Sequence, residues 1–372
     1  MPFADELLGA PAARSLLAAV RKARPRRRLQ ALTAAVTGLD GLTLRARCDL
    51  LTAALLDDIP GDDEDLGEVV RRLLADPAFT GWATWPVGEA VTARALEQLT
   101  TDAIDRALDL LPALTPLLSS EFAIRPLMIA DLPRVIAAAV RWTADPDPAV
   151  RRLASEGTRP YLPWARRVPA LDLDPAVTVP ILDALYRDPD EVVRRSVANH
   201  LNDLSRQHPE LVVATAAGWA AAPDVHTPRV VRHALRTLVK RGHPDALALL
   251  GFGAGGTVVV TGPVLRAGHV QDGGEIAFTG SILNPGAESV RVAVDYVLHF
   301  RKASGRTAPK VFKITTATLA PGEQLDLART FSFRPITTRR YHPGEHALEL
   351  QVNGVASGRV AFVYIGQGTG AV

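Results

Sequence analysis

A segment of 15 residues occurs three times in the middle of this chain, and the repeat restricts the fold more than any single motif does. The first two copies are DPDPAVRRLASEGTR at residues 145–159 and DPDEVVRRSVANHLN at residues 188–202, which superpose with an offset of 43 residues. A third copy, TPRVVRHALRTLVKR at residues 227–241, follows at an offset of 38. Periods near 40 residues are typical of solenoids, in which each unit buries its apolar face against its neighbours.

Each copy begins with the signals of a helix start, a Pro near the first turn and an Asp before it. A period of this length with two helices per unit is typical of HEAT-like repeats. We expect weaker units of the same kind over residues 1–140 and therefore predict a HEAT-like α-solenoid over residues 1–250. A stack of such units leaves a curved surface available for a partner.

The hydrophobic pattern changes near residue 252 from helical spacing to alternation at every second position. Alternate residues from Val290 to Phe300 are apolar, and Gly and Pro separate about seven short strands. This pattern predicts an immunoglobulin-like β-sandwich over residues 257–372.

The join between the two parts contains a G-x-G-x-x-G string within GFGAGGT, residues 251–257. A dinucleotide site needs that string after a strand and before a helix. Here the predicted order is the reverse, so we interpret residues 251–256 as a linker.

The composition excludes several classes of site. The 372 residues include one Cys, Cys48, so neither an intramolecular disulfide nor a Cys-based zinc cluster is expected within the chain. The nine His show no metal-ligand spacing such as HExxH, and no P-loop occurs. We expect no metal and no cofactor.

No stretch reaches about 18 consecutive apolar residues, and the start, MPFADELLGAP, is acidic where a secretory signal is basic. We therefore expect a monomeric, cytoplasmic protein that neither enters nor binds a membrane.

Polar side chains recur in register on one face of the repeated helices. Because each helical residue advances about 100°, Arg152, Glu156 and Arg159 fall together beside the packing stripe. The corresponding positions are Arg195, Asn199 and Asn202, followed by Asp203, in the second copy and His233, Thr237 and Lys240 in the third. The common register indicates more than a solvated face. The pattern alone favours Arg–Asp pairs that only lock the stack between repeats, and a binding face is the alternative.

Two further segments carry polar and aromatic residues that the packing of a helical solenoid does not require. In LTPLLSSEFAIRPLM, residues 114–128, Ser119 or Ser120 offers an N-cap, with Glu121 near the helix start and Arg125 four residues later. In GTRPYLPWARRVP, residues 157–169, two prolines deliver a loop with the side chains Tyr161, Trp164, Arg166 and Arg167. Aromatic and arginine side chains in such a loop suit stacking and phosphate contact, and the alternative for Trp164 is a core anchor.

The chain resembles the bacterial AlkC-type 3-methyladenine DNA glycosylases, which join HEAT-like repeats to a C-terminal immunoglobulin-like domain. The matching motifs are SSEFAIRP (119–126), VRRLASEGTRPYLPWA (150–165), VRRSVANHLNDLSRQHPE (193–210), WPVGEAV (85–91) and RRYHPGEH (339–346). This resemblance implies excision of bases alkylated at N3 from double-stranded DNA, without base flipping.

The resemblance also implies roles for individual residues. Glu156 and Asp203 are expected nearest the chemistry with Glu121 close behind, where carboxylates stabilise an oxocarbenium-like sugar and position water. Trp164 is expected against the lesion nucleotide. The expected DNA contacts are Arg125, Arg152, Arg159, Arg166, Arg195, Asn199, Asn202 and Lys240, with Arg339 and Arg340 from the β domain.

The main alternative is a non-catalytic solenoid that binds protein or DNA. The preferred lesion, 3-methyladenine or 3-methylcytosine, also stays open. The net charge of +2 divides into −4 over residues 1–119, +2 over residues 120–255 and +4 over residues 256–372. That polarity predicts a DNA path over the C-terminal two-thirds of the chain.

Overall fold

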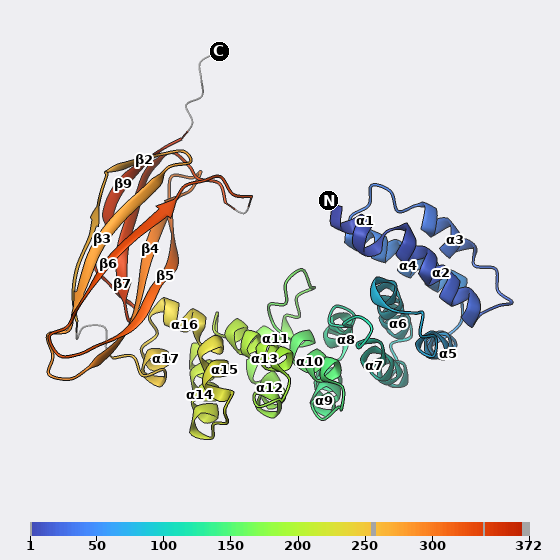
Figure 1. Ribbon diagram of the computed structural model, residues 1–372. Helices are drawn as coiled ribbons and strands as arrows, with labels where there is room; N and C mark the ends of the chain where they lie inside the picture. Colours follow the sequence, from blue (N-terminus) through green and yellow to red (C-terminus); the bar gives the residue numbers. More distant parts are fainter. Residues whose placement is uncertain (1, 254–257, 338, 367–372) are drawn as a thin grey trace, which may run out of the picture. The chain divides into compact units, whose positions relative to one another are not determined.

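The computed structural model describes residues 2–253, 258–337 and 339–366. Figure 1 shows helices along the first two-thirds of the chain and strands after them. The helices of the first part are α1 (Pro2–Leu8), α2 (Ala10–Ala23), α3 (Gln30–Thr37), α4 (Leu44–Asp58), α5 (Asp63–Leu74), η1 (Gly81–Ala83), α6 (Thr84–Gln98), α7 (Thr101–Leu114), α8 (Ile124–Ala130), α9 (Leu132–Trp142), α10 (Pro148–Gly157), α11 (Ala170–Leu173), η2 (Pro175–Thr178), α12 (Val179–Leu185), α13 (Glu191–Leu204), α14 (Pro209–Ala221) and α15 (Thr227–Ala234). Two short helices, α16 (Arg236–Arg241) and α17 (Pro244–Leu249), precede the strands.

The three sequence repeats form a stack in the C-terminal part of the helical region. Helix α10 packs on α9, α13 on α12 and α15 on α14, while α10, α13 and α15 contact one another in that order. Each of these helices buries an apolar stripe, which in α10 is formed by Val150, Leu153 and Ala154. The HEAT-like solenoid predicted from the repeat is therefore confirmed.

The Asp residues of the repeat hold the helix starts, as the sequence predicted. The Asp147 carboxylate accepts a hydrogen bond from the backbone N–H of Ala149 at 2.7 Å, and Asp190 accepts one from Val192 at 2.6 Å. Before α15, Asp224 accepts two backbone N–H groups in the same way. These bonds satisfy donors that a helix start leaves without an intrahelical partner.

The first arginine of each Arg-Arg pair binds the turn before its own helix, and Arg151 also joins two repeats. Arg151 makes two hydrogen bonds to the Asp188 carboxylate of the next repeat, at 2.6 and 3.0 Å, and both side chains are largely buried. It also binds two carbonyls of the turn before its own helix, and Arg194 binds the equivalent carbonyls in the next unit. The interpretation that Arg–Asp pairs hold the repeats together is thus confirmed for Arg151.

The compact units of the chain are Met1–Ala234 and Leu235–Val372, so α16 and α17 group with the strands. The third sequence copy is divided between them. Its helix breaks at Leu235, and His233 lies in the first unit while Thr237 and Lys240 lie in the second.

Backbone contacts explain why these two helices belong with the sheet. Gln351 donates to the Lys240 carbonyl at 2.9 Å, and Arg291 donates to the Leu250 carbonyl at 2.7 Å. Gly242 ends α16 with φ of 73°, and a Cβ there would lie 2.4 Å from the Cα of Gly354. This approach requires glycine because any side chain would meet backbone.

The second unit contains the predicted sandwich, in two sheets. The strands are β1 (Val259–Leu265), β2 (His269–Gln271), β3 (Glu275–Leu283), β4 (Val290–Arg301), β5 (Thr307–Leu319), β6 (Gln324–Ser332), β7 (Gly344–Val352), β8 (Val355–Ala356) and β9 (Val360–Ile365). One sheet has the order β1-β3-β6 and the other the order β2-β9-β7-β4-β5, with β8 paired to β7.

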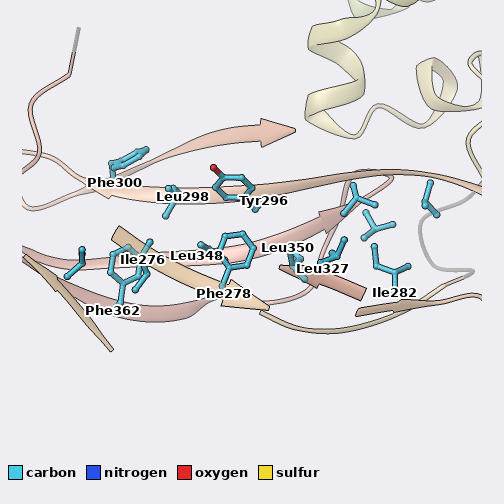
Figure 2. Packing of buried hydrophobic residues seen from close by; sticks show 14 of the residues in the cluster. Ile276, Phe278, Ile282, Tyr296, Leu298, Phe300, Leu327, Leu348, Leu350 and Phe362 are labelled. Carbon is cyan, nitrogen blue, oxygen red and sulfur yellow. The ribbon is translucent and has the colours of Figure 1, made fainter. Parts of the chain in front are cut away.

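The sandwich core lies between the sheets. Figure 2 shows Phe278 and Ile282 of β3 facing Tyr296 of β4 and Leu350 of β7, all buried. Of the alternate residues predicted as the core face of β4, those from Val292 to Phe300 are buried and Val290 is half-buried. The residues between Val292 and Phe300 are buried too, including Asp295. Burial raises the pKa of Asp295 to about 6.

The predicted linker, residues 251–256, lies partly outside the described residues, since residues 254–256 are not among them. Helix α17 precedes Gly251 and strand β1 follows at Val259, an order that does not suit a dinucleotide site. Within the described ranges, no helix combines the length and apolar character needed to cross a bilayer.

Candidate functional site

Three carboxylates and two guanidinium groups form a chain of ion pairs across the repeats. Arg159 donates from Nη1 to Glu156 Oε1 at 2.6 Å and from Nε to Asp203 Oδ2 at 2.9 Å. Arg152 donates to Glu121 Oε2 at 2.9 Å and lies 3.7 Å from Glu156 Oε1. With every group ionised the chain carries one net negative charge. We call Glu121, Arg152, Glu156, Arg159 and Asp203 the carboxylate network.

The three carboxylates come from three different elements. Glu121 lies in the turn before α8, which begins three residues later than the helix start predicted at this segment. Glu156 lies in the last turn of α10, and Asp203 in the last turn of α13. The stacking of α10 on α13 therefore brings together residues that are 47 positions apart in the sequence, from 156 to 203.

Glu156 is the most fully bonded carboxylate of the network. Its Oε1 accepts from Arg159, and its Oε2 accepts from the Ser196 hydroxyl at 2.6 Å. Burial pushes the pKa of Glu156 upward, but Arg159, Ser196 and Arg152 together outweigh burial and hold the pKa below its ordinary value. Glu156 is therefore a fixed negative charge, already supplied with hydrogen bonds on both oxygens.

Asp203 differs in both respects. Burial raises the pKa of Asp203 above its ordinary value, although Arg159 and Arg206 oppose the shift. Oδ2 accepts from Arg159, and no hydrogen bond from another described residue occupies Oδ1. A carboxylate with a raised pKa and one oxygen available can accept a proton from water more readily than an ordinary aspartate.

Glu121 is the most accessible carboxylate of the three. Its Oε2 accepts from Arg152 and from the Ser119 hydroxyl, each at 2.9 Å. Ser119 or Ser120 was expected as an N-cap, but the Ser119 hydroxyl bonds this carboxylate and the Ser120 hydroxyl bonds the Leu111 carbonyl. Oε1 of Glu121 has no hydrogen bond from the part of the chain that the structure describes.

A second layer of polar groups lies behind Glu156. The Ser196 hydroxyl is 2.9 Å from that of Ser155, and His200 contacts the Ser155 carbonyl at 2.8 Å. The other ring nitrogen of His200 lies 3.1 Å from the Thr178 hydroxyl. Complete burial lowers the pKa of His200 to about 4, so the ring is neutral near pH 7. Sequence reasoning missed Ser196. It lies three residues, about one helical turn, before Asn199 in the second copy, and that spacing was the available signal.

The loop after α10 presents Trp164 to solvent. Its side chain is 99% exposed, and its backbone lies in the left-handed region with φ of 60°. The alternative that Trp164 anchors the core is therefore wrong. A large apolar side chain held away from the protein suits contact with a partner.

Tyr161 holds the same loop from its other side. Its ring lies between two guanidinium groups, with Arg167 at 3.8 Å and Arg206 at 4.2 Å from the ring centroid. Arg206 lies in the turn just after α13, three residues beyond Asp203, so the loop is tied to the end of the helix that carries one carboxylate of the network. Sequence reasoning did not find Arg206.

The expectation that Arg125 contacts DNA is wrong in this structure. Its side chain is 0% exposed, and Nη1 donates to the carbonyls of Gly157 and Arg159 at 2.9 and 2.8 Å. Nε donates to the Arg166 carbonyl. Arg125 therefore closes the base of the loop over residues 157–166 from inside the protein.

Arg159 also departs from its predicted role. It is buried and bonded to two carboxylates, so it is not available to hold a phosphate. Arg166 and Arg195 are exposed, and neither is ion-paired with any described residue. Asn202 is buried and Asn199 half-buried.

Three of the residues expected to contact DNA, Lys240, Arg339 and Arg340, belong to the second compact unit, whereas the carboxylate network belongs to the first. Lys240 and Arg340 are exposed there. The Arg339 guanidinium lies over the Phe300 ring at 4.7 Å from its centroid and is half-buried. Among the described residues, no group of three or more His, Cys, Asp or Glu is arranged to hold a metal ion.

The fold and the site define a class: a HEAT-like solenoid with buried carboxylates bridged by arginines, joined to an immunoglobulin-like domain. Residues 259–364 match the family model described as the C-terminal Ig-like domain of the uncharacterised protein YhaZ. The chain is 34% identical to the uncharacterized protein YhaZ of Bacillus subtilis (strain 168), over 84% of this chain and 85% of that protein. It is also similar to the solved Pseudomonas fluorescens alkylpurine DNA glycosylase AlkC bound to DNA containing an abasic site analog, with a TM-score of 0.84, 31% identity, and 97% of this chain and 99% of that chain covered.

The chain therefore belongs to the family that includes AlkC and YhaZ. The resemblance that the sequence motifs suggested is confirmed, and so is the order of a helical solenoid before an immunoglobulin-like domain.

Proposed function

We propose that this protein is a monofunctional DNA glycosylase that hydrolyses the N-glycosidic bond of bases alkylated at N3. The carboxylate network is the observation that carries the proposal. Such a base is cationic and leaves readily, so the enzyme needs no general acid. It needs negative charge beside the sugar, where an oxocarbenium-like cation forms, and a group that receives a proton from water.

The network supplies both functions from different carboxylates. Glu156, with its lowered pKa and two bonded oxygens, provides negative charge without reorganisation. Asp203, with its raised pKa and available Oδ1, accepts the proton as water attacks C1′ and the bond from C1′ to the base breaks. Glu121 adds a third carboxylate, more accessible than the other two, at the solvent side.

The loop and the exposed arginines supply the DNA contacts. Trp164 packs against the lesion nucleotide from outside the protein, which suits a lesion that stays stacked in the duplex. Arg166 and Arg195 hold phosphates. The solved relative AlkC is bound to DNA with an abasic site analog, the product class of this reaction, and that likeness supports duplex DNA as the partner.

The test is an incubation of the purified protein with N-methylated duplex DNA, followed by measurement of free 3-methyladenine and 3-methylcytosine in the supernatant. We expect release of 3-methyladenine that increases with enzyme and time. No release above background, under conditions where the protein binds the same DNA, would establish a non-catalytic DNA-binding module instead. The ratio of the two bases decides the preferred lesion.

A further inference from the structure

We propose that the connection between α2 and α3 forms a second DNA-binding surface, which holds the phosphate backbone of undamaged duplex away from the carboxylate network. The choice of DNA as the partner rests on the proposed function. A basic run in the sequence is the first observation. No Asp or Glu occurs from residue 7 to residue 39, and the basic residues in that span are Arg14, Arg21, Lys22, Arg24, Arg26, Arg27 and Arg28.

This basic run is hidden in the charge of its region. Residues 1–119 carry a net charge of −4, although 7 of their 13 basic residues lie between positions 14 and 28. The acidic residues of the region therefore lie elsewhere along the chain. The expectation that the DNA path excludes the N-terminal helices came from averaging over this segment.

The arginines of the connection are exposed and available. Lys22 pairs with Asp76 at 3.0 Å, and Arg24 lies 4.0 Å from Asp65. Arg26, Arg27 and Arg28 are exposed, and none is paired with an acidic group among the described residues. An unpaired arginine cluster attracts a polyanion because no internal carboxylate competes for it.

Asp58 lies at the start of α3 and is already bonded there. Asp58 accepts the backbone N–H of Ala31 at 3.1 Å and that of Leu32 at 2.7 Å, in the first turn of α3. With both oxygens bonded to the helix start, the Asp58 carboxylate does not neutralise the arginines at residues 26–28.

Arg27 and Arg28 of the connection, with Arg21 of α2, border a hollow between the two helices. A surface depression of about 650 Å³ is lined by Arg21, Arg27 and Arg28 together with Gln30, Thr33 and Thr37. The connection itself joins the blue helices α2 and α3 in Figure 1. Guanidinium and amide donors around one depression suit repeated contact with phosphate oxygens.

Backbone contacts of this kind carry no sequence information and bind undamaged DNA as well as damaged DNA. A glycosylase must spend most of its time on undamaged duplex, so a surface outside the network would hold DNA while lesions are sought. Each neutralised phosphate contributes about 0.9 to the slope of log K against log salt concentration. Three arginines would therefore contribute a slope of roughly 2.7.

The test measures binding of an undamaged duplex oligonucleotide across a range of salt concentrations for the triple variant Arg26→Ala, Arg27→Ala, Arg28→Ala. We expect the salt slope to fall by about 2 to 3 and the affinity at low salt to fall at least tenfold. The matched control is Arg45→Ala, Arg71→Ala, Arg134→Ala, which removes the same charge from arginines paired with carboxylates. The control should keep most of the slope.

A slope of the triple variant equal to that of the control would overturn the proposal. So would loss of binding to vesicles of phosphatidylglycerol and phosphatidylcholine in equal parts with the DNA slope unchanged, because the surface would then serve a membrane. The assay uses DNA without lesions, so its result is independent of base excision. Single-turnover excision at saturating protein should be the same for the triple variant and wild type.

Discussion

Helices α10 and α13 share their first turns and differ in their last turns. At their starts, an aspartate caps the helix and an arginine binds the carbonyls of the preceding turn, in the same register 43 residues apart. At their ends, Glu156 and Arg159 of the first copy correspond to Asn199 and Asn202 of the second. The positions shared at the starts build the stack, and Glu156 and Arg159 of the network lie where the copies differ.

The largest effect on stability should come from the shared starts. In Arg151→Ala the buried Asp188 carboxylate loses its partner, so the free energy of unfolding should fall by about 3 kcal/mol. Urea unfolding followed by far-UV circular dichroism measures the change. The control is Arg229→Ala, which removes an exposed pair with Glu191 between neighbouring repeats and should lower stability by less than about 1 kcal/mol. Equal losses would show that the shared starts do not hold the stack.

A smaller effect is expected at the base of the Trp164 loop. Arg125→Met removes three hydrogen bonds to carbonyls that close the loop, so the loss of stability should be local to the loop. The loop should then open more often, and trypsin should cleave after Arg166 or Arg167 at least about tenfold faster than in wild type. Arg134→Met, a surface substitution, is the control. Unchanged cleavage of the loop in Arg125→Met would show that this arginine does not position Trp164.

The two carboxylates at the helix ends should differ in their pH dependence. The raised pKa of Asp203 means that it gains a proton at higher pH than an ordinary aspartate, so single-turnover excision should begin to fall on acidification above about pH 4. Glu156, with its lowered pKa, stays ionised over that range. The acid limb should persist in Glu156→Gln and disappear from the residual rate of Asp203→Asn. An acid limb retained in Asp203→Asn would assign the titration to another group.

The smallest effect is expected at the second arginine of the repeated pair. Arg195 is exposed, and its removal in Arg195→Ala should reduce the salt slope of DNA binding by about 1 while leaving the excision rate at saturation unchanged. Arg195→Lys should restore the slope. A slope unchanged in Arg195→Ala would remove this residue from the DNA contacts.

Much of the fold could be predicted from the sequence because the repeat and the hydrophobic spacing are local patterns that can be seen in the sequence itself. The DPD turns, the apolar stripes and the alternation in β4 are local patterns, and each specifies its element. The division of the third copy was not predictable in this way. It depends on the approach of Gly242 to Gly354, more than one hundred residues later in the chain, from 242 to 354.

The sequence predicted which residues form the site, but not what its arginines contact. The helical wheel places Arg152, Glu156 and Arg159 on one face, and the structure joins them by ion pairs. The wheel does not show that Arg159 is enclosed between carboxylates or that Arg125 points into the protein. Whether a guanidinium meets a phosphate or a carbonyl depends on the packing of the neighbouring repeat.

The role of the carboxylate network in the chemistry is best tested by single-turnover excision of 3-methyladenine by Asp203→Asn and Glu156→Gln, with duplex affinity measured in parallel. We predict that each substitution lowers the rate tenfold or more, about 1.4 kcal/mol of transition-state stabilisation, while the affinity stays within about threefold of wild type. Rates within twofold of wild type for both variants would contradict the assignment of the carboxylate network to the chemistry.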